Sequence, residues 1–256
     1  MVRFEVWRLV DLAKELLQLK VDLFASQSTE AIIAIQNINE TIPIVMTTIS
    51  DPIGNKLIAS FARPGGNTTG VTNSSTDLAT KRLDLLKEVV PNLSRVAVLV
   101  ERDHPPTATM IKETQAAAGA MRIELQILEV HPEQIRDAFK SMEKARPDAL
   151  IVQQTATFNA YIKEIVDLAL DVRLPSVHEN REYVRAGGLI AYGVDIFASG
   201  QRAAYYVDRI LKGTNPADLP VEQPTKFVLA LNLKCAKTLG VTVPPALLAT
   251  ADEVIE

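Results

Sequence analysis

The sequence predicts an α/β protein whose parallel sheets are covered by helices and divided between two lobes. Short apolar runs, typical of buried parallel strands, alternate with longer segments whose apolar residues recur at helical spacing. Repeated βα units of this size form parallel sheets with helices on both faces. The chain has 256 residues, of which 47% are hydrophobic, and this is enough for two modest cores.

The N-terminal third of the chain alternates between strand and helix signals. Residues 4–7 alternate apolar and polar side chains like a strand, and a helical stripe of apolar residues runs from Leu9 to Leu17. Val21 to Ala25 is a short apolar run that predicts a buried parallel strand. Next we expect a helix at 29–37, a strand at 42–46, a turn at 63–67, a strand at 69–71 and a helix from Ala79 that ends at Pro91.

The rest of the chain repeats this rhythm from a strongly apolar strand at 95–100. Helices are expected at 110–121, 135–142, 161–172 and 203–211, strands at 123–130, 149–152, 175–178, 189–192 and 227–231, and then two short helical pieces. Gly187 and Gly188 form a turn before the strand at 189–192, and Gly213 is a suitable C-terminal cap for the last long helix.

Two places in the sequence indicate where the chain passes between lobes. One helix ends at Pro91 and a fresh βα series begins near Leu93 to Arg95. Near Tyr192 to Asp195, a glycine-flanked strand precedes a new helix. We therefore predict that residues 1–93 and 195–256 form lobe 1 and that residues 94–194 form lobe 2.

Composition excludes several classes of function. The net charge is −4 and no long run of Lys or Arg occurs, so a nucleic-acid partner is not expected. No apolar stretch approaches the roughly 20 residues that a membrane helix needs. Cys235 is the single cysteine, which excludes a disulfide framework and a thiolate metal site. Its apolar neighbours indicate a buried side chain rather than a reactive thiol.

Polar residues follow the predicted strands of lobe 1, where ligands bind in open parallel sheets. Ser26, Gln27, Ser28 and Thr29 open a helix and could bind an anion or carboxylate, or simply cap that helix. The next strand ends in the segment 47–52. Its Thr48, Ser50 and Asp51 could hold the carboxylate and ammonium of a small zwitterion, or form a polar turn before Pro52. Asn73 begins a third polar strand end, which could equally be a helix cap.

Three strand ends of lobe 2 also carry polar residues. They are Glu101 with its three successors, Gln154 with Thr155, and Glu179 with Asn180. Glu101 and Glu179 could each reach the amine of a ligand, although such charges are more often solvated.

Signals of catalysis are weak. The three histidines, His104, His131 and His178, are scattered and have no metal-ligand spacing. The sequence contains no nucleophile elbow, no phosphate-binding P-loop and no dinucleotide fingerprint opening a helix. We therefore expect no catalytic residues, no metal and no cofactor.

Several short segments together resemble one family, the type I periplasmic substrate-binding proteins of ABC transporters that include the tryptophan-binding TrpX-like proteins. The resemblance covers nearly the whole chain and is specific because unrelated patterns occur in one order. The matching segments are 62–71, 81–88, 95–99, 181–193 and 210–240.

The resemblance implies two Rossmann-like lobes, joined by crossover strands, that close on a small solute. It matches the lobe 1 anchors to Ser26–Thr29 and Thr48–Asp51, and the lobe 2 loops to Glu101, Thr155 and the region from Glu179 through Tyr192 to Asp195. It also implies ABC permease subunits as partners, a periplasmic or extracellular lipid-anchored location, and an amino-acid-like or other polar organic solute.

The chain departs from this family at its start. No signal peptide is visible, and a first βα unit before Phe4 to Trp7 is expected to be missing from lobe 1. An incomplete parallel sheet would leave an unpaired edge, through which a homodimer could form. The alternatives are a ligand-sensing regulatory domain of the same fold, for which no basic helix-turn-helix segment is visible, and an enzyme on a doubly wound sheet.

Overall fold

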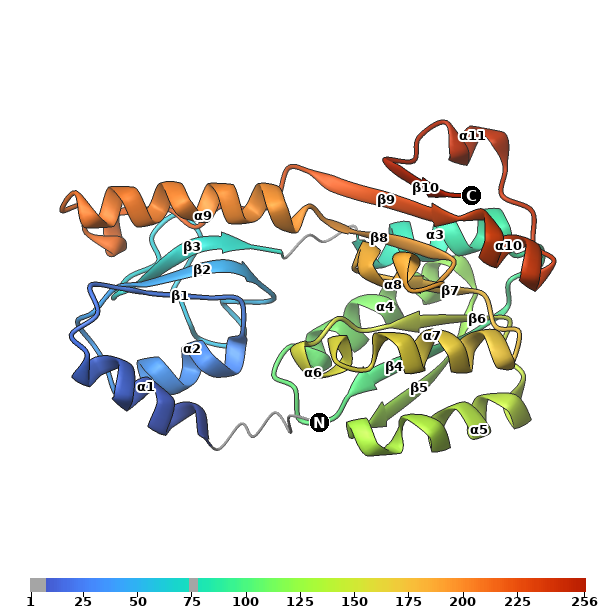
Figure 1. Ribbon diagram of the computed structural model, residues 1–256, viewed down its shortest axis with the longest axis horizontal. Coiled ribbons are helices and arrows are strands. Elements are labelled where there is room, and N and C mark those ends of the chain that lie inside the picture. The colour runs from blue at the N-terminus through green and yellow to red at the C-terminus, as the bar shows by residue number, and fades with distance from the viewer. Residues whose placement is uncertain (1–7, 74–77) are drawn as a thin grey trace. The chain divides into compact units, whose positions relative to one another are not determined.

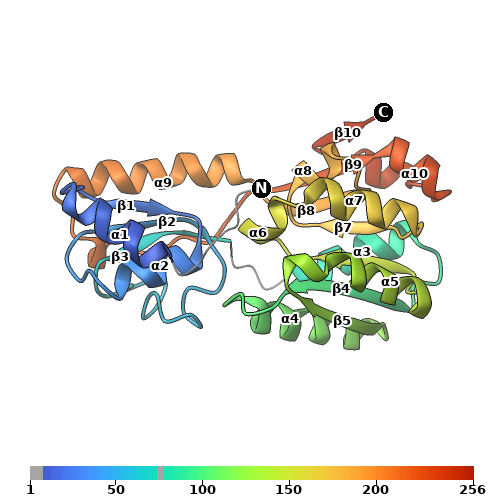
Figure 2. The ribbon, with the colours of Figure 1, turned by 60° about the horizontal axis from the view of Figure 1, so that its bottom comes forward.

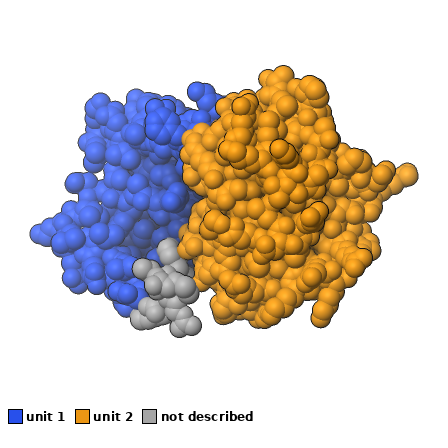
Figure 3. Space-filling model, turned by 45° about the vertical axis from the view of Figure 1, so that its right-hand side comes forward, with its two compact units in different colours: residues 1–75, 195–226 blue, residues 76–194, 227–256 orange. Residues whose placement is uncertain are grey.

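The computed structural model describes residues 8–73 and 78–256. The strand expected at Phe4 to Trp7, and the part of the third polar strand end from Ser74 to Thr76, lie outside these residues. The chain forms two compact units, coloured separately in Figure 3. Unit 1 comprises residues 1–75 and 195–226, and unit 2 comprises residues 76–194 and 227–256.

Unit 1 is a three-stranded parallel sheet with helices on both faces (Figure 1). Its elements are α1 (Leu9–Gln18), β1 (Phe24–Ser26), α2 (Thr29–Gln36), β2 (Ile44–Ile49), β3 (Thr68–Thr72), α9 (Ile196–Leu211) and a 3₁₀ turn (Pro216–Asp218). The strand order is β1-β2-β3, and Ser26 is in register with Met46. All carboxyl ends of the described strands of this sheet therefore lie at one edge.

Alternate residues of β2 pack on opposite faces of the unit 1 sheet, as a strand buried on both sides requires. Ile44 and Met46 belong to the core beneath α1 and α2, whereas Val45 packs with Ala203 and Tyr206 of α9. This burial on both faces explains why the sequence of β2 is apolar without alternation.

Unit 2 is built on a seven-stranded sheet, which Figures 1 and 2 show from two directions. Its helices are α3 (Leu78–Val89), α4 (Thr107–Met121), α5 (Ile135–Ala145), α6 (Ala156–Asn159), α7 (Ile162–Asp171), α8 (Arg181–Arg185), α10 (Leu233–Leu239) and α11 (Pro245–Leu248), with a 3₁₀ turn (Pro132–Gln134). Its strands are β4 (Arg95–Glu101), β5 (Glu124–Val130), β6 (Ala149–Val152), β7 (Ser176–His178), β8 (Ile190–Val194), β9 (Phe227–Asn232) and β10 (Glu253–Ile255).

The unit 2 sheet has the order β10-β9-β8-β7-β6-β4-β5. The strands from β4 to β8 pair in parallel, as expected, but β8 and β9 are antiparallel. The chain leaves unit 2 after β8, forms residues 195–226 of unit 1, and re-enters as β9. The chain therefore re-enters unit 2 along β9 in the direction opposite to that in which it left along β8.

Two cores flank the unit 2 sheet, and the side chains of β4 divide between them. Val96, Val98 and Val100 pack against residues of α3 and α4, while Ala97 and Leu99 pack with Phe139 of α5 and residues of α7. The predicted α/β fold with helices on both faces of parallel sheets is confirmed for each unit.

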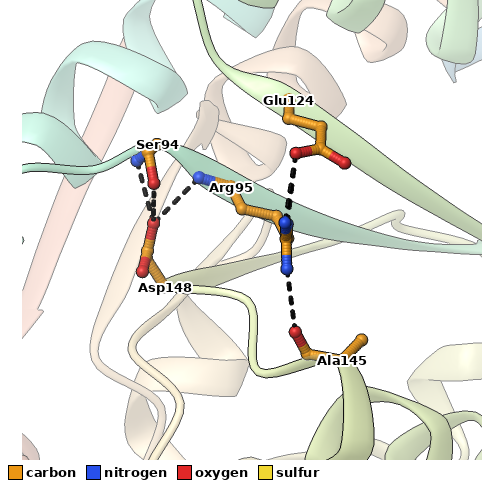
Figure 4. A network of polar contacts seen from close by, with 5 residues as sticks. All are labelled: Ser94, Arg95, Glu124, Ala145 and Asp148. Carbon is orange, nitrogen blue, oxygen red and sulfur yellow. Dashed lines mark hydrogen bonds and ion pairs between the residues drawn. The ribbon is translucent and has the colours of Figure 1, made fainter.

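The amino ends of β4, β5 and β6 are joined by a network of polar contacts (Figure 4). The Asp148 carboxylate accepts hydrogen bonds from the backbone N–H groups of Ser94 and Arg95, at 2.9 and 2.8 Å, and from the Ser94 hydroxyl at 2.9 Å. Arg95 pairs with Glu124 at 3.3 Å and donates to the Ala145 carbonyl at 3.0 Å. These contacts fix the relative register of the three strands at their amino ends. This edge of the sheet is opposite the edge that carries their polar carboxyl ends.

The units differ from the predicted lobes at two boundaries. The segment 76–93, which contains α3, and the C-terminal segment 227–256 both belong to unit 2 rather than to the first lobe. Both are held there by side-chain packing and strand pairing: α3 packs against α4, and β9 pairs with β8. A helix end is visible in a sequence, but the sheet on which that helix packs is not. The boundary between Val194 and Asp195 falls where the second crossing was placed.

Candidate functional site

The carboxyl edge of the unit 2 sheet gathers the polar residues expected in lobe 2. Leu99 of β4 is in register with Val152 of β6, and Val152 with His178 of β7. Each of these three strand positions is followed within one to three residues by a predicted site residue: Glu101 at the end of β4, Thr155 after β6 and Glu179 after β7. The structure therefore brings all three to the same edge. This is the edge at which open parallel sheets bind ligands.

Glu101 is the last residue of β4, and its backbone is firmly held. Its N–H donates to the Gln153 side-chain oxygen at 2.9 Å, and its carbonyl accepts from the Thr107 hydroxyl at 2.9 Å. The carboxylate differs, because Oε2 is buried and has no hydrogen-bond partner among the described residues. A buried carboxylate oxygen without a partner is costly and calls for a specific explanation.

Glu179 differs from Glu101 because its carboxylate is fully engaged. One oxygen lies 3.2 Å from Arg82 Nη2 of α3, and the other accepts from the Gln154 N–H at 3.3 Å. Arg82 also donates through Nε to the Tyr192 carbonyl at 2.9 Å. The side chains of Arg82 and Glu179 are only 6% and 15% exposed. This pair therefore ties α3 to β8 and to the loop after β7.

Arg82 was not among the site residues predicted from the sequence, although its position in the helix carried a signal. Arg82 lies between Ala79 and Leu83 on the buried face of α3, where the helical stripe of apolar residues predicts another apolar side chain. A charged residue in such a stripe is almost never fully buried unless it is paired. The anomaly in the pattern could have indicated a buried partner, but not which carboxylate supplies it.

Tyr183 of α8 is a second residue at this edge that was not predicted from the sequence. It is 1% exposed, its ring stacks on His178 at 4.4 Å between centroids, and its hydroxyl has no hydrogen-bond partner in the described part of the chain. Burial raises the pKa of this phenol, and the nearby carboxylates of Glu179 and Glu101 raise it further. The hydroxyl therefore stays protonated beside two carboxylates.

His178 is a structural residue of the core beneath this edge. It is completely buried, and burial lowers its pKa to about 3, so the ring is neutral at physiological pH. One ring nitrogen lies 2.8 Å from the Ser176 hydroxyl. Because it is buried and neutral, His178 adds no charge to the site.

Thr155 and Tyr192 are also held by local structure. The Thr155 hydroxyl accepts a hydrogen bond from the Phe158 N–H at 3.0 Å and so caps α6, and the residue is 3% exposed. Tyr192 of β8 is partly buried, and its ring stacks with Phe227 at 6.0 Å between centroids. Its backbone carbonyl, rather than its side chain, contacts Arg82.

In unit 1, the loop after β1 is organised as a helix cap. The Ser28 hydroxyl oxygen accepts from the Ala31 N–H at 3.1 Å and the hydroxyl donates to Glu30 at 2.8 Å, while Ser26 Oγ accepts from the Ser28 N–H at 3.1 Å. Thr29 is buried and Gln27 is exposed. The capping interpretation of this loop is confirmed, and its role in binding stays a prediction.

The end of β2 carries an irregularity in its pairing. The register with β3 shifts between Met46 and Ile49, so Thr48 lies in a bulge, a device that often re-aims side chains near functional sites. Asp51 follows with a left-handed backbone (φ 44°), and its carboxylate accepts from the Gly54 N–H at 2.9 Å. Ser50, between them, is partly buried.

Asn73 follows β3 at the same edge of the unit 1 sheet. Its backbone N–H donates to the Ile49 carbonyl at 3.0 Å. Its side-chain Oδ1 is buried without a hydrogen-bond partner among the residues that the structure describes. The predicted residues after β2 and β3 are therefore brought together by strand pairing.

A cavity of about 350 Å³ lies beside the start of α9 in unit 1. Of the predicted site residues, Asp195 lines it, and this residue also caps α9 by accepting from the Phe197 and Ala198 N–H groups. Arg202 and Glu222 form an ion pair in its wall, and the hydrogen bond from Arg202 lowers the pKa of the Glu222 carboxyl. The guanidinium also lies 3.9 Å from the centre of the Tyr205 ring.

Cys235 is buried in the unit 2 core, as its apolar neighbours predicted. Burial raises the pKa of its thiol to about 11. Within residues 8–73 and 78–256, no three His, Cys, Asp or Glu side chains gather as a metal site would require. None of the helices described there has the length and apolar character needed to cross a membrane.

Comparison with known proteins gives one family match and several similar structures. A family model described as ABC transporter substrate binding protein matches residues 5–255. A tyrosine-binding protein of Clostridioides difficile is 24% identical over 222 residues, which cover 86% of this chain. The chain spans 63% of the length of that relative.

Two solved structures cover 98% of this chain, and this chain covers 84% of each. One is an ABC domain from Streptococcus pneumonia in complex with L-Trp, with a TM-score of 0.92 and 26% identity. The other is a conserved domain protein from Vibrio cholerae, with a TM-score of 0.92 and 25% identity.

Proposed function

Because the chain belongs to the ABC transporter substrate-binding protein family, we propose that it is the solute-binding component of an importer. Its ligand is a small amino-acid-like or other polar organic solute, which it binds and releases chemically unchanged. Two similar proteins support the amino-acid class, since one is a tyrosine-binding protein and the other was solved in complex with L-Trp.

One observation from the geometry carries this proposal. The carboxyl edge of the unit 2 sheet gathers the polar residues Glu101, Thr155 and Glu179, and buried oxygens of Glu101 and Tyr183 there have no partner among the described residues. Buried polar atoms are nearly always hydrogen-bonded in folded proteins. A solute that supplies the missing donors and acceptors would explain why these atoms are retained.

The first test is a thermal-shift screen of the amino acids and small carboxylates, followed by titration calorimetry of the hits. A ligand at about 100 times its Kd adds about 2.7 kcal/mol to the free energy of unfolding, which raises Tm by several degrees. Hits confined to nucleotides or metal ions would contradict the proposed class. Chemical change in the recovered ligand, followed by NMR, would favour an enzyme instead.

Two variants test whether the unit 1 loops take part. Asp51→Ala and Ser28→Ala should weaken binding of the identified solute without unfolding the protein. Ser28→Ala also removes a helix cap, which costs about 0.5–2 kcal/mol, so binding must be measured well below Tm. Asp137→Ala on the exposed face of α5 is the matched control and should bind like the unaltered protein. Equal affinity in all three variants would remove these loops from the site.

The proposed partners and location follow from the family. ABC permease subunits in the membrane would receive the loaded protein, in the periplasm or, with a lipid anchor, at the outer cell surface. Reconstitution of uptake with a cognate permease in proteoliposomes tests this directly, because transport should require the binding protein outside the vesicle.

A homodimer through the edge of unit 1 remains a further proposal. Among the described residues β1 pairs on one side only, with β2. Leu12 and Leu16 of α1 are each 42% exposed, and Leu19, which follows this helix, is 74% exposed. Light scattering coupled to size exclusion should detect a dimer that Leu16→Glu dissociates. A monomer at all concentrations would contradict this proposal.

A further inference from the structure

The cavity beside α9 lies apart from the strand ends at which ligand-binding residues of unit 1 were predicted. α9 packs on the face of the unit 1 sheet opposite to α1 and α2 (Figure 1). None of the predicted residues that follow β1, β2 and β3 lines this cavity of about 350 Å³. Asp195 does line it, but its carboxylate already accepts hydrogen bonds from the Phe197 and Ala198 N–H groups, at 3.0 and 3.1 Å. Most of the cavity therefore has no role in the function proposed above.

Both walls of the cavity are held by contacts within the protein. One wall is the first half of α9, where the Ser199 hydroxyl donates to the Asp195 carbonyl at 3.0 Å. The other wall is the segment 222–226. Its first residue, Glu222, donates its N–H to the Gly70 carbonyl at 3.0 Å, which anchors the segment beside β3. The cavity is therefore formed before any ligand binds.

An ion pair joins the two walls. Arg202 of α9 donates through Nε to one carboxylate oxygen of Glu222 at 2.6 Å and through Nη2 to the other. Two-point pairing of a guanidinium with a carboxylate fixes the geometry of both groups. The guanidinium also covers one face of the Tyr205 ring, 3.9 Å from its centre, and Tyr205 is still 41% exposed. Ring surface therefore remains open to a ligand.

The charges around the cavity cancel. Arg202 and Glu222 neutralise each other, and the remaining charged pair is Asp195 and Lys226. These two residues lie opposite each other where the β8–β9 ladder continues, since the Asp195 N–H donates to the Lys226 carbonyl at 3.1 Å. Because one carboxylate caps α9 and the other is held by Arg202, the ammonium group of a ligand would find neither of them free. An anion that approached Lys226 would be repelled by both carboxylates. The lining therefore favours an uncharged ligand.

The remaining polar side chains of the lining are free to bind. Gln201, Gln223 and Thr225 are exposed, and their side chains make no hydrogen bond within the part of the chain that the structure describes. Amide and hydroxyl groups both donate and accept hydrogen bonds, as the hydroxyl groups of a polyol do. Val71 of β3 and the open ring of Tyr205 add apolar surface. The lining thus combines uncharged hydrogen-bonding groups with an aromatic ring.

We propose that this cavity is a second binding site of the protein, and that it takes a neutral polyhydroxylated molecule of about monosaccharide size. Binding sites for small molecules have volumes of about 300–1,000 Å³, and this cavity is at the lower end of that range. The hydroxyl groups of the ligand pair with the two glutamine amides and with Thr225, and its C–H face packs on the Tyr205 ring. The site is independent of the one proposed for the imported solute.

The experiment is an NMR titration of the isotope-labelled protein with sugars and their charged counterparts. D-glucose and D-galactose are the neutral probes, and each is compared with its uronate and its 2-amino derivative. We expect at least one of the two sugars to shift the backbone amide signals of residues 195–205 and 222–226, with a Kd of about 1 mM or lower. Its own uronate and amino derivative should bind at least about 10-fold more weakly, because each brings a charge to a lining that is already balanced.

Three variants assign the binding to this cavity. Gln223→Ala removes one amide and should weaken the sugar by about 3- to 10-fold. Ala198→Leu fills the cavity from α9 and should weaken the sugar by more than about 10-fold. Gln18→Ala, at an exposed residue of unit 1 outside the cavity, is the matched control and should bind like the unaltered protein. If Ala198→Leu does not fold, the exposed position of Gln223 still provides the test.

Affinity for the imported solute is the second measurement, and it should be unchanged in all three variants. Solute affinity that falls together with sugar affinity would make the cavity part of the solute site and overturn the second site. Failure of both sugars to bind would also overturn it and leave the proposed function standing. Charged counterparts that bind as tightly as their parent sugar would refute the neutral class. Equal sugar affinity in the unaltered protein and in both cavity variants would place the binding elsewhere on the protein.

Discussion

Replacing Glu179 by glutamine tests whether this carboxylate serves the fold rather than the ligand. The change keeps the size of the side chain and one acceptor oxygen, but removes the charge that faces Arg82. The companion variants are Arg82→Met and the double substitution. Glu124→Gln is the matched control, because Glu124 pairs with Arg95 at 3.3 Å in the same unit, close to the 3.2 Å of the Arg82–Glu179 pair.

The expected magnitude follows from burial. The Arg82 and Glu179 side chains are 6% and 15% exposed, whereas those of Arg95 and Glu124 are 43% and 69% exposed. Removing one member of a buried pair costs about 3–5 kcal/mol, and exposed pairs contribute about 0–1 kcal/mol. Because glutamine can still accept from Arg82, we expect about 2–3 kcal/mol for Glu179→Gln and less than about 0.5 kcal/mol for Glu124→Gln.

Arg82→Met removes both of its hydrogen bonds and leaves Glu179 buried, so it should cost about 3–5 kcal/mol. The double variant should cost less than the sum of the single ones by about 2 kcal/mol, since each single change leaves the other group unpaired.

Urea unfolding followed by circular dichroism gives the free energies. Hydrogen exchange in peptides that cover β4, β6 and β8 assigns any loss to unit 2. Equal costs for Glu179→Gln and Glu124→Gln would refute the argument from burial. Loss of solute binding in Glu179→Gln with unaltered stability would make this residue a ligand contact instead.

Three further predictions concern pH and packing. The buried ring of His178 stays neutral in the folded protein, whereas in the unfolded chain it takes up a proton as the pH falls below a pKa of about 6.5. The unfolding free energy should therefore fall by up to about 2 kcal/mol from pH 7 to pH 5. His178→Leu should flatten this slope in urea titrations, and an unchanged slope would contradict the assignment. Partial burial of Asp148 acts to raise its pKa, but the hydrogen bonds from Ser94 and Arg95 at the start of β4 outweigh it and the pKa is lowered. Asp148→Asn should therefore cost about 1–2 kcal/mol at pH 7, and the difference from the unaltered protein should disappear as the pH falls well below 4. Gly193→Ala places a methyl group 1.9 Å from the Glu179 carbonyl oxygen and should cost more than about 2 kcal/mol, whereas Gly200→Ala meets no atom within 4 Å and should be neutral or stabilising in thermal unfolding.

The order and type of most elements were predictable from the sequence. The strand at 95–100 and the helix from Ile135 are examples, since strand and helix periodicities depend on residues that are neighbours in the chain. The polar residues after each strand were predictable for the same reason, because a parallel strand must end before the polar loop that follows it. The helix bounds differ by a few residues at caps such as Pro106 before α4.

The tertiary structure decided which of these polar residues have partners within the protein. Glu101 and Glu179 are alike in the sequence, each at the end of an apolar strand. Only folding brings Arg82, 97 residues before Glu179, to one of them and leaves the other unpaired. The same holds for α3 and β9, which belong to unit 2 because of the strands they contact, and for the antiparallel pairing of β8 with β9.

The amino-acid sequence alone therefore determined the fold class, the family and the edges of the sheets where polar groups gather. These properties arise from local periodicity and from short segments that occur in a fixed order. Pairing between distant charges, the unit boundaries and the unpaired oxygens of Glu101 and Tyr183 required the three-dimensional structure, because electrostatic compensation depends on distance in space and not on separation along the chain.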